Sequence, residues 1–368
     1  MSKHPKTLPD VPWHKRLEIA GRHFLVWLLG LLFRSRNQPV TLGESPRILV
    51  VRLDERLGNL VMLMPLLASL KARYPTATIE LLASPKHQEF LLLQPLISEL
   101  LIFNKRKLLA YDGPFRTPRR LRKRHYDLAM DATNPTDPSA TQAVLVRLSG
   151  ARHTVGFDTA DFGRLFSCPV KSPSEPLHEI DLRLALLDPL PGEARVRIPT
   201  LAAVAMPTPN SAIGRFLQDE VFFQKVVLIN LGARLEAKRL SGEDYAAIAN
   251  VVHEKGFAVC LAYGPSEEQF AKYVTTLCPY TKLAPPTSVL ELAALMTASC
   301  AVISCDTGPM HLAVGLGKPT CGIFVCTEPW RYGYGVLPHT IIDARIGTVQ
   351  KWLPDIAAWV FNALRRCP

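Results

Sequence analysis

The sequence contains no C-x-x-C pair and no D-x-D triplet, although eight cysteines are present. Several of these cysteines lie in apolar, strand-like runs such as Ala258–Ala262, which favours small buried side chains in a reducing compartment over zinc ligands. The missing D-x-D removes a carboxylate pair that commonly holds a divalent cation. We therefore expect no metal site.

A run of apolar residues long enough to cross a bilayer is also missing near the N-terminus. Phe24–Phe33 is apolar over ten residues, and as a helix it would extend about 15 Å, which is about half of a hydrocarbon core. Lys and Arg flank the run, and no small-residue cleavage site follows it. We expect residues 1–45 to form an amphipathic segment that lies on a membrane surface; a helix packed on the protein body and a weakly supported signal peptide are the alternatives.

Acidic residues are in the minority, since the formal net charge is +11 and the pI is about 9.3. Such a charge favours anionic partners: a membrane surface, a phosphorylated glycolipid or nucleic acid. One stretch, 105–124, carries nine Lys and Arg against the single acid Asp112. It contains no nucleic-acid recognition motif, so we expect either a solvated basic face or a surface for phosphorylated lipids, and no nucleic acid.

Strand-like and helical patterns alternate from Arg47 onward. Arg47–Leu53 has the apolar character of a buried parallel strand, Leu60–Tyr74 has helical spacing, and Thr78–Ala83 repeats the strand pattern. The Pro-rich segment 191–209 predicts a linker, after which the alternation restarts at Val226–Asn230. This alternation of strands and helices predicts an α/β fold with two Rossmann-like, doubly wound domains that face a central cleft.

The length of 368 residues also fits two domains. We expect an N-terminal domain over residues 46–190, a C-terminal domain over residues 210–345 and a closing helix over residues 346–368. An NAD-dependent dehydrogenase has a similar plan, but no G-x-G-x-x-G follows the first strand, and this disfavours that class.

Three polar motifs each follow a strand of the expected C-terminal domain. They are Asn230–Arg239 (NLGARLEAKR), Tyr263–Glu267 (YGPSE) and Ser304–His311 (SCDTGPMH). The first can bring two cations to a diphosphate, the second can offer a carboxylate to a ribose, and the third opens a helix whose free amides suit an anion. Each alone also fits an ordinary loop or capped helix, but the carboxyl ends of parallel strands would bring all three together.

The order of these motifs resembles glycosyltransferase family 9, the bacterial heptosyltransferases of lipopolysaccharide core assembly. Arg47–Leu70 is also similar to the opening strand, glycine loop and helix of that family. The resemblance implies a GT-B fold and an inverting, metal-independent transfer from an ADP-heptose-type donor to a lipopolysaccharide core or other surface glycolipid. It implies no cofactor beyond the nucleotide sugar, and a cytoplasmic enzyme peripheral to the inner face of the bacterial inner membrane.

The resemblance also implies roles for individual residues. Lys238 would neutralise the donor diphosphate, Glu267 would meet the ribose and Thr287 the base pocket. The donor-binding set as a whole is Gly232, Arg234, Lys238, Glu267, Thr287, Asp306, Thr307, Gly308 and His311. From the basic stretch, in the half where the family binds its acceptor, we expect Arg120, Arg122 and Lys123 to contact the acceptor.

One residue departs from the family pattern. The opening loop of the family ends in Gly-Asp, whose Asp is the expected general base, whereas this sequence has Gly58 and Asn59. An amide cannot accept the proton as a carboxylate does. Asp54 in the same loop is the replacement that we expect, if a base exists. The alternatives are a catalytically impaired nucleotide-sugar-binding relative and a family member that uses a different nucleotide sugar.

Overall fold

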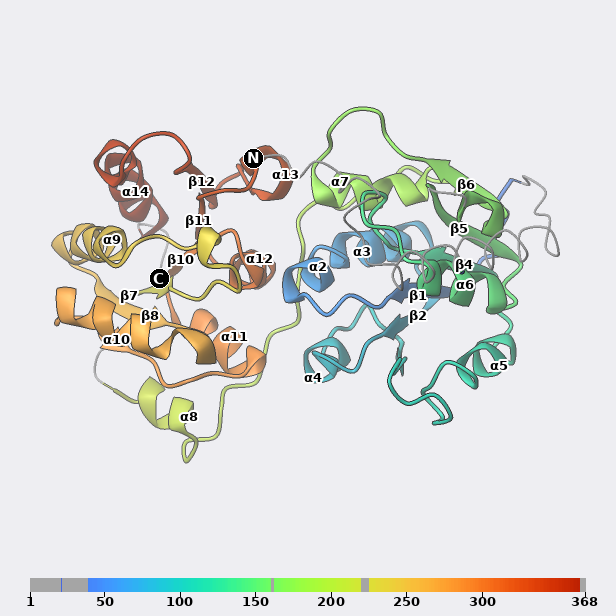
Figure 1. Ribbon diagram of the computed structural model, residues 1–368, viewed down its shortest axis with the longest axis horizontal. Coiled ribbons are helices and arrows are strands. Elements are labelled where there is room, and N and C mark those ends of the chain that lie inside the picture. The colour runs from blue at the N-terminus through green and yellow to red at the C-terminus, as the bar shows by residue number, and fades with distance from the viewer. Residues whose placement is uncertain (1–20, 22–38, 160–161, 220–224, 365–368) are drawn as a thin grey trace.

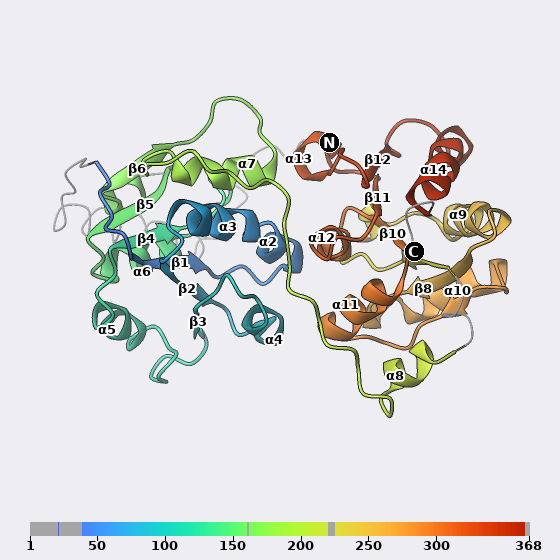
Figure 2. The same cartoon turned by 180° about the vertical axis from the view of Figure 1, so that it is seen from behind.

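The computed structural model describes residue 21 and residues 39–159, 162–219 and 225–364. Each half of the chain is built on a parallel six-stranded sheet, with the order β3-β2-β1-β4-β5-β6 in the first and β12-β11-β10-β7-β8-β9 in the second. In each sheet the next two strands are added on one side of the half's first strand and the last three on its other side, as in dinucleotide-binding folds. Figures 1 and 2 show helices on both faces of each sheet. The expected α/β fold with two doubly wound sheets is confirmed.

The first half contains apolar strands that are buried because helices cover both faces of the sheet. Its strands are β1 (Arg47–Arg52), β2 (Thr78–Ala83), β3 (Glu99–Ile102), β4 (Leu128–Asp131), β5 (His153–Asp158) and β6 (Cys168–Lys171). Its helices are α2 (Leu57–Val61), α3 (Met64–Arg73), α4 (Gln88–Leu92), α5 (Thr117–Arg122), α6 (Ala140–Leu148) and α7 (Glu179–Leu184).

The second half repeats the same plan with longer helices. Its strands are β7 (Val226–Asn230), β8 (Ala258–Ala262), β9 (Lys282–Leu283), β10 (Ala301–Cys305), β11 (Thr320–Phe324) and β12 (Thr340–Asp343). Its helices are α8 (Ala212–Leu217), α9 (Gly242–Glu254), α10 (Glu268–Leu277), α11 (Val289–Ala298), α12 (Gly308–Gly315), α13 (Pro329–Tyr332) and α14 (Val349–Leu364).

The single helix expected over Leu60–Tyr74 is wrong, because the chain forms two helices there, α2 and α3. Pro65 lies in the first turn of α3. Proline has no N–H to donate to the carbonyl four residues earlier, at Val61, and Val61 is the last residue of α2. The segment is helical as expected, but a second helix begins beside Pro65.

The expected linker, residues 191–209, contains neither helix nor strand and passes from the first half to the second (Figure 1). Almost all of the expected membrane-associating segment, including Phe24–Phe33, lies outside the described residues. Among the residues that the structure describes, no helix is long and apolar enough to span a bilayer.

Two glycines set the distance between the halves. A Cβ atom added at Gly58 in α2 would lie 2.7 Å from Cδ2 of His311, and one at Gly308 in α12 would lie 3.2 Å from Cβ of Leu57. A side chain at Gly58 would require His311 to move, and one at Gly308 would require Leu57 to give way by a few tenths of an ångström. The missing side chains therefore allow α2 of the first half to contact the first turn of α12 in the second half.

Candidate functional site

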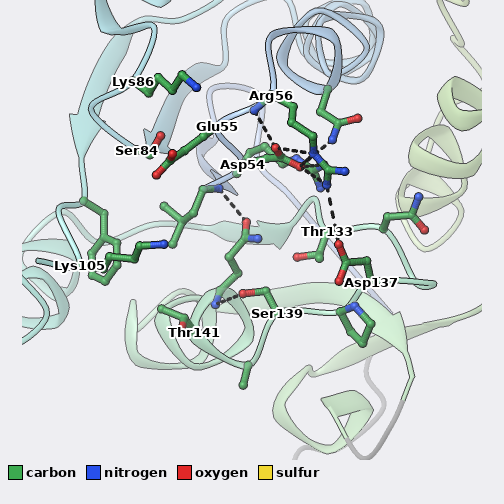
Figure 3. A pocket seen from close by; sticks show the side chains of 18 of the residues that line it. Asp54, Glu55, Arg56, Ser84, Lys86, Lys105, Thr133, Asp137, Ser139 and Thr141 are labelled. Carbon is green, nitrogen blue, oxygen red and sulfur yellow. Dashed lines mark hydrogen bonds and ion pairs between the residues drawn. The ribbon is translucent and has the colours of Figure 1, made fainter. Parts of the chain in front are cut away.

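A cavity of about 660 Å³ lies at the carboxyl ends of β1, β2 and β4. Most of its lining belongs to the first half of the chain, and Arg331 and Tyr332 of α13 reach it from the second half. This edge of a doubly wound sheet is where such folds bind ligands. In Figure 3, Lys86 and Lys105 lie on one side of the cavity, and Arg56 and Asp137 lie on the other.

Asp54 lines this cavity directly after β1, and its carboxylate is densely hydrogen-bonded. Its Oδ2 accepts from Nη2 of Arg52 at 3.0 Å and from Nη2 of Arg56 at 2.8 Å, while Oδ1 accepts from the backbone N–H of Arg56 at 2.8 Å. Burial alone would raise the pKa of Asp54, but the hydrogen bonds from Arg56 and the charge of Arg52 lower it to about 2. Asp54 is therefore ionised at neutral pH, and its lone pairs are largely occupied.

Asn59 connects this carboxylate to a second, buried cation. Its Nδ2 donates to Oδ2 of Asp54 at 2.6 Å, and its Oδ1 accepts from Nη2 of Arg183 at 3.3 Å. Arg183 is 2% exposed, so the amide lies between a carboxylate and a guanidinium that water scarcely reaches. An amide with one acceptor and two donors suits this position without adding charge.

Glu179 joins the two halves across the cavity. Its carboxylate accepts from Nδ2 of Asn134 at 2.8 Å and from Nη2 of Arg331 at 2.6 Å, and it lies 3.3 Å from Nη1 of Arg183. Burial opposes ionisation, but Arg183 and Arg331 outweigh it and lower the pKa of Glu179. One buried carboxylate thus balances a guanidinium from each half.

The side of the cavity opposite Asp137 is mainly basic, although Glu55 also lies there beside Ser84 (Figure 3), and it contains an unsatisfied hydroxyl. Lys86, Lys105 and Arg106 are exposed residues of the lining. Ser84 is 6% exposed, and its Oγ finds no hydrogen-bond partner among the described residues. A buried hydroxyl without a partner costs free energy unless a ligand or water satisfies it, so this side suits an anionic or hydroxyl-bearing ligand.

The predicted donor residues of the second half gather at the carboxyl ends of β7 and β10. Nζ of Lys238 donates to Oδ2 of Asp306 at 2.7 Å and to its backbone oxygen at 3.1 Å, and Oγ1 of Thr327 also donates to Oδ2 at 2.7 Å. Burial would raise the pKa of Asp306, but the contacts from His311 and Lys238 hold it far below its usual range. The same Nζ lies 5.8 Å from the ring centre of Tyr332, which lines the cavity.

Helix α12 begins at this point without a side-chain cap. Thr307 is its N-cap residue, but Oγ1 of Thr307 donates to the backbone oxygen of Cys305 at 3.2 Å. The carboxylate of Asp306 is committed to Lys238, Thr327 and His311. Neither side chain therefore caps α12, and within the described part of the chain the first-turn amides have no side-chain cap, as an anion site at this helix start requires.

His311 is buried one turn into α12. Its Nδ1 lies 2.9 Å from the hydroxyl of Tyr334, and its Nε2 lies 3.6 Å from Oδ1 of Asp306. Burial raises the pKa of Tyr334 well above its ordinary value, so the phenol stays protonated. His311 therefore connects Asp306 to the loop after α13.

The other predicted donor residues lie farther along the same sheet edge. Glu267 is buried after β8, and its carboxylate accepts from Oγ of Ser266 at 2.6 Å. Gly232 follows β7, and a Cβ added there would lie 3.2 Å from the backbone nitrogen of Gly264. Arg234 is exposed and Thr287, just before α11, is half-buried. These residues lie outside the lining of the 660 Å³ cavity.

The predicted acceptor residues Arg120, Arg122 and Lys123 lie on and just after α5, outside the cavity lining. Arg120 stacks on the ring of Tyr111 at 3.8 Å and donates to its backbone oxygen at 3.0 Å. Sequence reasoning missed Arg183, Glu179 and Arg331. For two of them a signal existed, because Glu179 and Arg183 have the four-residue spacing of a helical ion pair.

A sequence model of glycosyltransferase family 9, described as heptosyltransferase, matches residues 115–344. Lipopolysaccharide heptosyltransferase 3 of Escherichia coli is 26% identical over 291 residues, which cover 74% of this chain and 83% of the relative. The lipopolysaccharide core heptosyltransferase OpsX of Haemophilus influenzae is 31% identical over 134 residues, covering 35% of this chain and 38% of the relative.

Two solved structures share the fold. The glycosyl transferase family 9 protein of Veillonella parvula superimposes with a TM-score of 0.71 at 18% identity, over 89% of this chain and 98% of its own. The E. coli heptosyltransferase WaaC with ADP gives a TM-score of 0.67 at 16% identity, over 86% and 99% of the two chains. The GT-B arrangement expected from the sequence is thereby confirmed.

Proposed function

The chain belongs to glycosyltransferase family 9, and from this premise we propose that it transfers a heptose-type sugar from an ADP-activated donor to a lipopolysaccharide core or another surface glycolipid. The transfer inverts the anomeric carbon: an acceptor hydroxyl attacks from one face while the nucleoside diphosphate leaves from the other. The bond from the acceptor oxygen to the sugar forms, the bond from the sugar to the diphosphate breaks, and the hydroxyl proton passes to a base.

The contact between Lys238 and Asp306 carries the donor half of this proposal. Lys238 is half-buried, so it retains a face from which it can meet a diphosphate. The uncapped first turn of α12 supplies amides beside it, and helix N-termini attract anions. Glu267 and Thr287 then remain for the ribose and the base, at the neighbouring strand ends.

Cationic side chains also support a transfer that needs no divalent metal. Lys238 offsets the negative charge that develops on the leaving diphosphate, which is the task that a metal performs in other transferases. No group of three or more His, Cys, Asp or Glu in the described ranges could hold a metal ion. The metal-independent route therefore rests on Lys238 and the α12 amides.

The acceptor half of the proposal rests on the basic side of the cavity. Ser84, Lys86 and Lys105 can meet a phosphate or carboxylate of a glycolipid, while Asp54 lies across the cavity near the hydroxyl to be deprotonated. Arg120, Arg122 and Lys123 remain predicted contacts for more distant acceptor phosphates. An acceptor that carries a lipid places the enzyme at the membrane surface as a peripheral protein.

A second function, nucleotide-sugar binding without turnover, is favoured by one observation. Asp54 has a pKa of about 2, and Arg52, Arg56 and Asn59 occupy its oxygens, so it is a weak proton acceptor. Transfer by this chain then depends on Asp54 shedding one of these partners when the acceptor binds.

Calorimetry with ADP-heptose, a UDP-sugar and a GDP-sugar tests the donor, and mass spectrometry of a lipopolysaccharide core acceptor tests transfer. We expect binding of ADP-heptose alone and a mass gain of one heptose on the acceptor. Tight binding with no product supports the non-transferring relative. Preference for a UDP- or GDP-sugar would overturn the assignment of the donor.

A further inference from the structure

The segment between β3 and α5, residues 104–116, presents large apolar side chains to solvent; we call it the docking loop. Leu109 is 75% exposed and Phe115 is 67% exposed, and Leu108 and Tyr111 are also more than half exposed. Figures 1 and 2 both show this segment projecting beyond the body of the first half. Four clustered, exposed apolar side chains on one loop are typical of an interaction site.

Hydrogen bonds hold the docking loop in this projecting form. The backbone N–H of Asn104 donates to the oxygen of Asp112 at 2.8 Å and closes its base. A Cβ atom at Gly113 would lie 1.9 Å from the backbone oxygen of Lys107, so only glycine fits this turn. Arg120 fixes Tyr111 from α5 by stacking on its ring. The apolar side chains are therefore displayed by an ordered loop.

Positive charge surrounds the apolar tip. Lys105, Arg106 and Lys107 precede it, and Arg116 and Arg119 follow it, all of them exposed. Among the described residues, none of these five forms an ion pair, whereas Arg124 at the far end of the basic stretch pairs with Glu80 and Glu99. The unpaired cations near the tip are available for an anionic partner.

We propose that the docking loop inserts Leu108, Leu109 and Phe115 into an anionic lipid surface while its cations contact the headgroup phosphates. Apolar side chains that enter the acyl boundary, ringed by Lys and Arg, have the complementarity that such a surface requires. Tyr111 suits the headgroup level, where an aromatic ring with a polar end is favoured. We commit to a bilayer rather than a protein because the exposed apolar side chains stand on a projecting loop and are flanked on both sides by exposed Lys and Arg.

This inference rests on the proposed glycolipid acceptor and gives it a route to the cavity. Lys105 and Arg106 belong both to the docking loop and to the cavity lining. When the tip is inserted, these two residues lie between the lipid surface and the cavity. A headgroup that rises from the bilayer then passes them before it reaches Asp54.

Sedimentation with vesicles of phosphatidylglycerol and phosphatidylcholine tests the proposal on the full chain. We expect the triple variant Leu108→Ser, Leu109→Ser, Phe115→Ser to bind at least about tenfold more weakly than the wild type, because it loses most of the exposed apolar area of the docking loop. The matched control is Val336→Ser, Leu337→Ser, Ile346→Ser, which removes three exposed apolar residues of the second half. We expect this control to bind as the wild type does.

Insertion is measured independently of total binding by quenching with brominated lipids. A tryptophan at the tip, Leu109→Trp, should add fluorescence that brominated lipid quenches, whereas Ile346→Trp should add fluorescence that it does not. Equal quenching of both, or none at Leu109→Trp, would overturn the proposal even if another segment holds the chain on vesicles.

Transfer to a water-soluble, deacylated acceptor separates this inference from the proposed function. We expect the docking-loop variant to keep wild-type turnover on that acceptor and to lose turnover on the same glycan in vesicles. If wild type and variant are both inactive on the soluble acceptor, the proposed function fails. The vesicle measurements then still test whether the docking loop inserts into lipid. Equal turnover of both proteins in vesicles would contradict the role of the docking loop in acceptor delivery.

Discussion

Nδ2 of Asn59 lies 2.6 Å from Oδ2 of Asp54 and donates a hydrogen bond to it. Asn59 stands where the family resemblance implies a carboxylate, and it is hydrogen-bonded to Asp54, which we propose as the base instead. On the other side of the amide, Arg183 donates a hydrogen bond to the oxygen of Asn59. The chemistry at this point belongs to the pair, and substitution of either residue changes the surroundings of the other.

Replacing Asp54 by Asn keeps the shape of the side chain and removes the proposed proton acceptor. We expect turnover to fall by about 100- to 10,000-fold, the usual contribution of a positioned base. Donor affinity should stay close to that of the wild type, because the proposed donor residues belong to the other half. Steady-state kinetics and calorimetry on the same preparation measure both quantities. Full activity in Asp54→Asn would assign Asp54 a purely structural role.

Replacing Asn59 by Asp places two carboxylates within hydrogen-bonding distance of each other. Such a pair shares a proton, so one of the two groups should titrate above its usual pKa even with Arg183 nearby. We expect the pH profile of kcat/KM in Asn59→Asp to gain an inflection, with the rate rising as the shared proton is lost. The wild type should lack this inflection, because Asp54 has a pKa of about 2. Superimposable profiles would argue against coupling of the two positions.

If Asn59→Asp is much more active than the wild type while Asp54→Asn keeps full activity, then Asp54 is not the base. The natural protein would then be an enzyme with little or no turnover, and Asp54 would only organise its loop.

Replacing Lys238 by Ala removes the cation that we assign to the donor diphosphate. We expect nucleotide-sugar binding to weaken by about 1.5–3 kcal/mol, the scale of a hydrogen bond to a charged group. Lys272→Ala is the matched control, because Lys272 also pairs with a carboxylate, but on the exposed face of α10. Calorimetry with ADP-heptose measures both variants, and equal affinities would remove Lys238 from the donor site.

Transfer should proceed without a divalent cation. We expect turnover in excess EDTA to equal turnover in magnesium, because Lys238 and the α12 amides are proposed to offset the charge of the leaving group. Dialysed enzyme, assayed in EDTA and after adding magnesium or manganese, gives the comparison. A strict requirement for either metal would contradict this route.

Replacing Glu179 by Gln leaves Arg183 buried without its counter-charge. We expect a loss of about 3–5 kcal/mol of stability, the usual result of removing one partner of a buried ion pair. Arg331→Gln is the control: it removes the ion pair of Arg331 with Glu179 across the halves but keeps the pair of Glu179 and Arg183. Thermal melts monitored by circular dichroism should rank Glu179→Gln below Arg331→Gln.

The same variant has a pH signature. The folded state lowers the pKa of Glu179, so its stabilisation is complete above the unfolded pKa and is lost as the pH falls through the folded pKa. The difference in melting temperature between wild type and Glu179→Gln should therefore be constant near neutrality and shrink below about pH 4. A difference that grows in acid would contradict this assignment.

Much of the architecture could be predicted because it depends on local pattern. Apolar runs such as Val226–Asn230 become central strands wherever helices cover them, and the polar motifs that follow them must meet at one sheet edge. Lys238 and Asp306 are far apart in sequence, yet their positions after β7 and β10 already predicted that they would meet.

The contacts between the halves could not be predicted in this way. Arg331 reaches Glu179 from a short helix whose position depends on how the two sheets pack, and nothing near Arg331 in sequence encodes that packing. Likewise the commitment of Asp54 to Arg52, Arg56 and Asn59 follows from the path of a loop rather than from any periodicity. The cavity is lined mostly by the first half for the same reason: side chains that pack across the halves determine where space remains.

The close approach of Gly58 in α2 to Gly308 in α12 bears on when the nucleotide can enter and leave. Leu57 and Gly58 lie against Gly308, the first residue of α12, beside the turn where the donor diphosphate is proposed to bind. A nucleotide sugar would therefore enter before the halves meet, and the spent nucleotide would stay enclosed until they part. Turnover at saturating substrate would then be limited by the rate of parting and would slow in viscous solvent, even when the chemical step is fast.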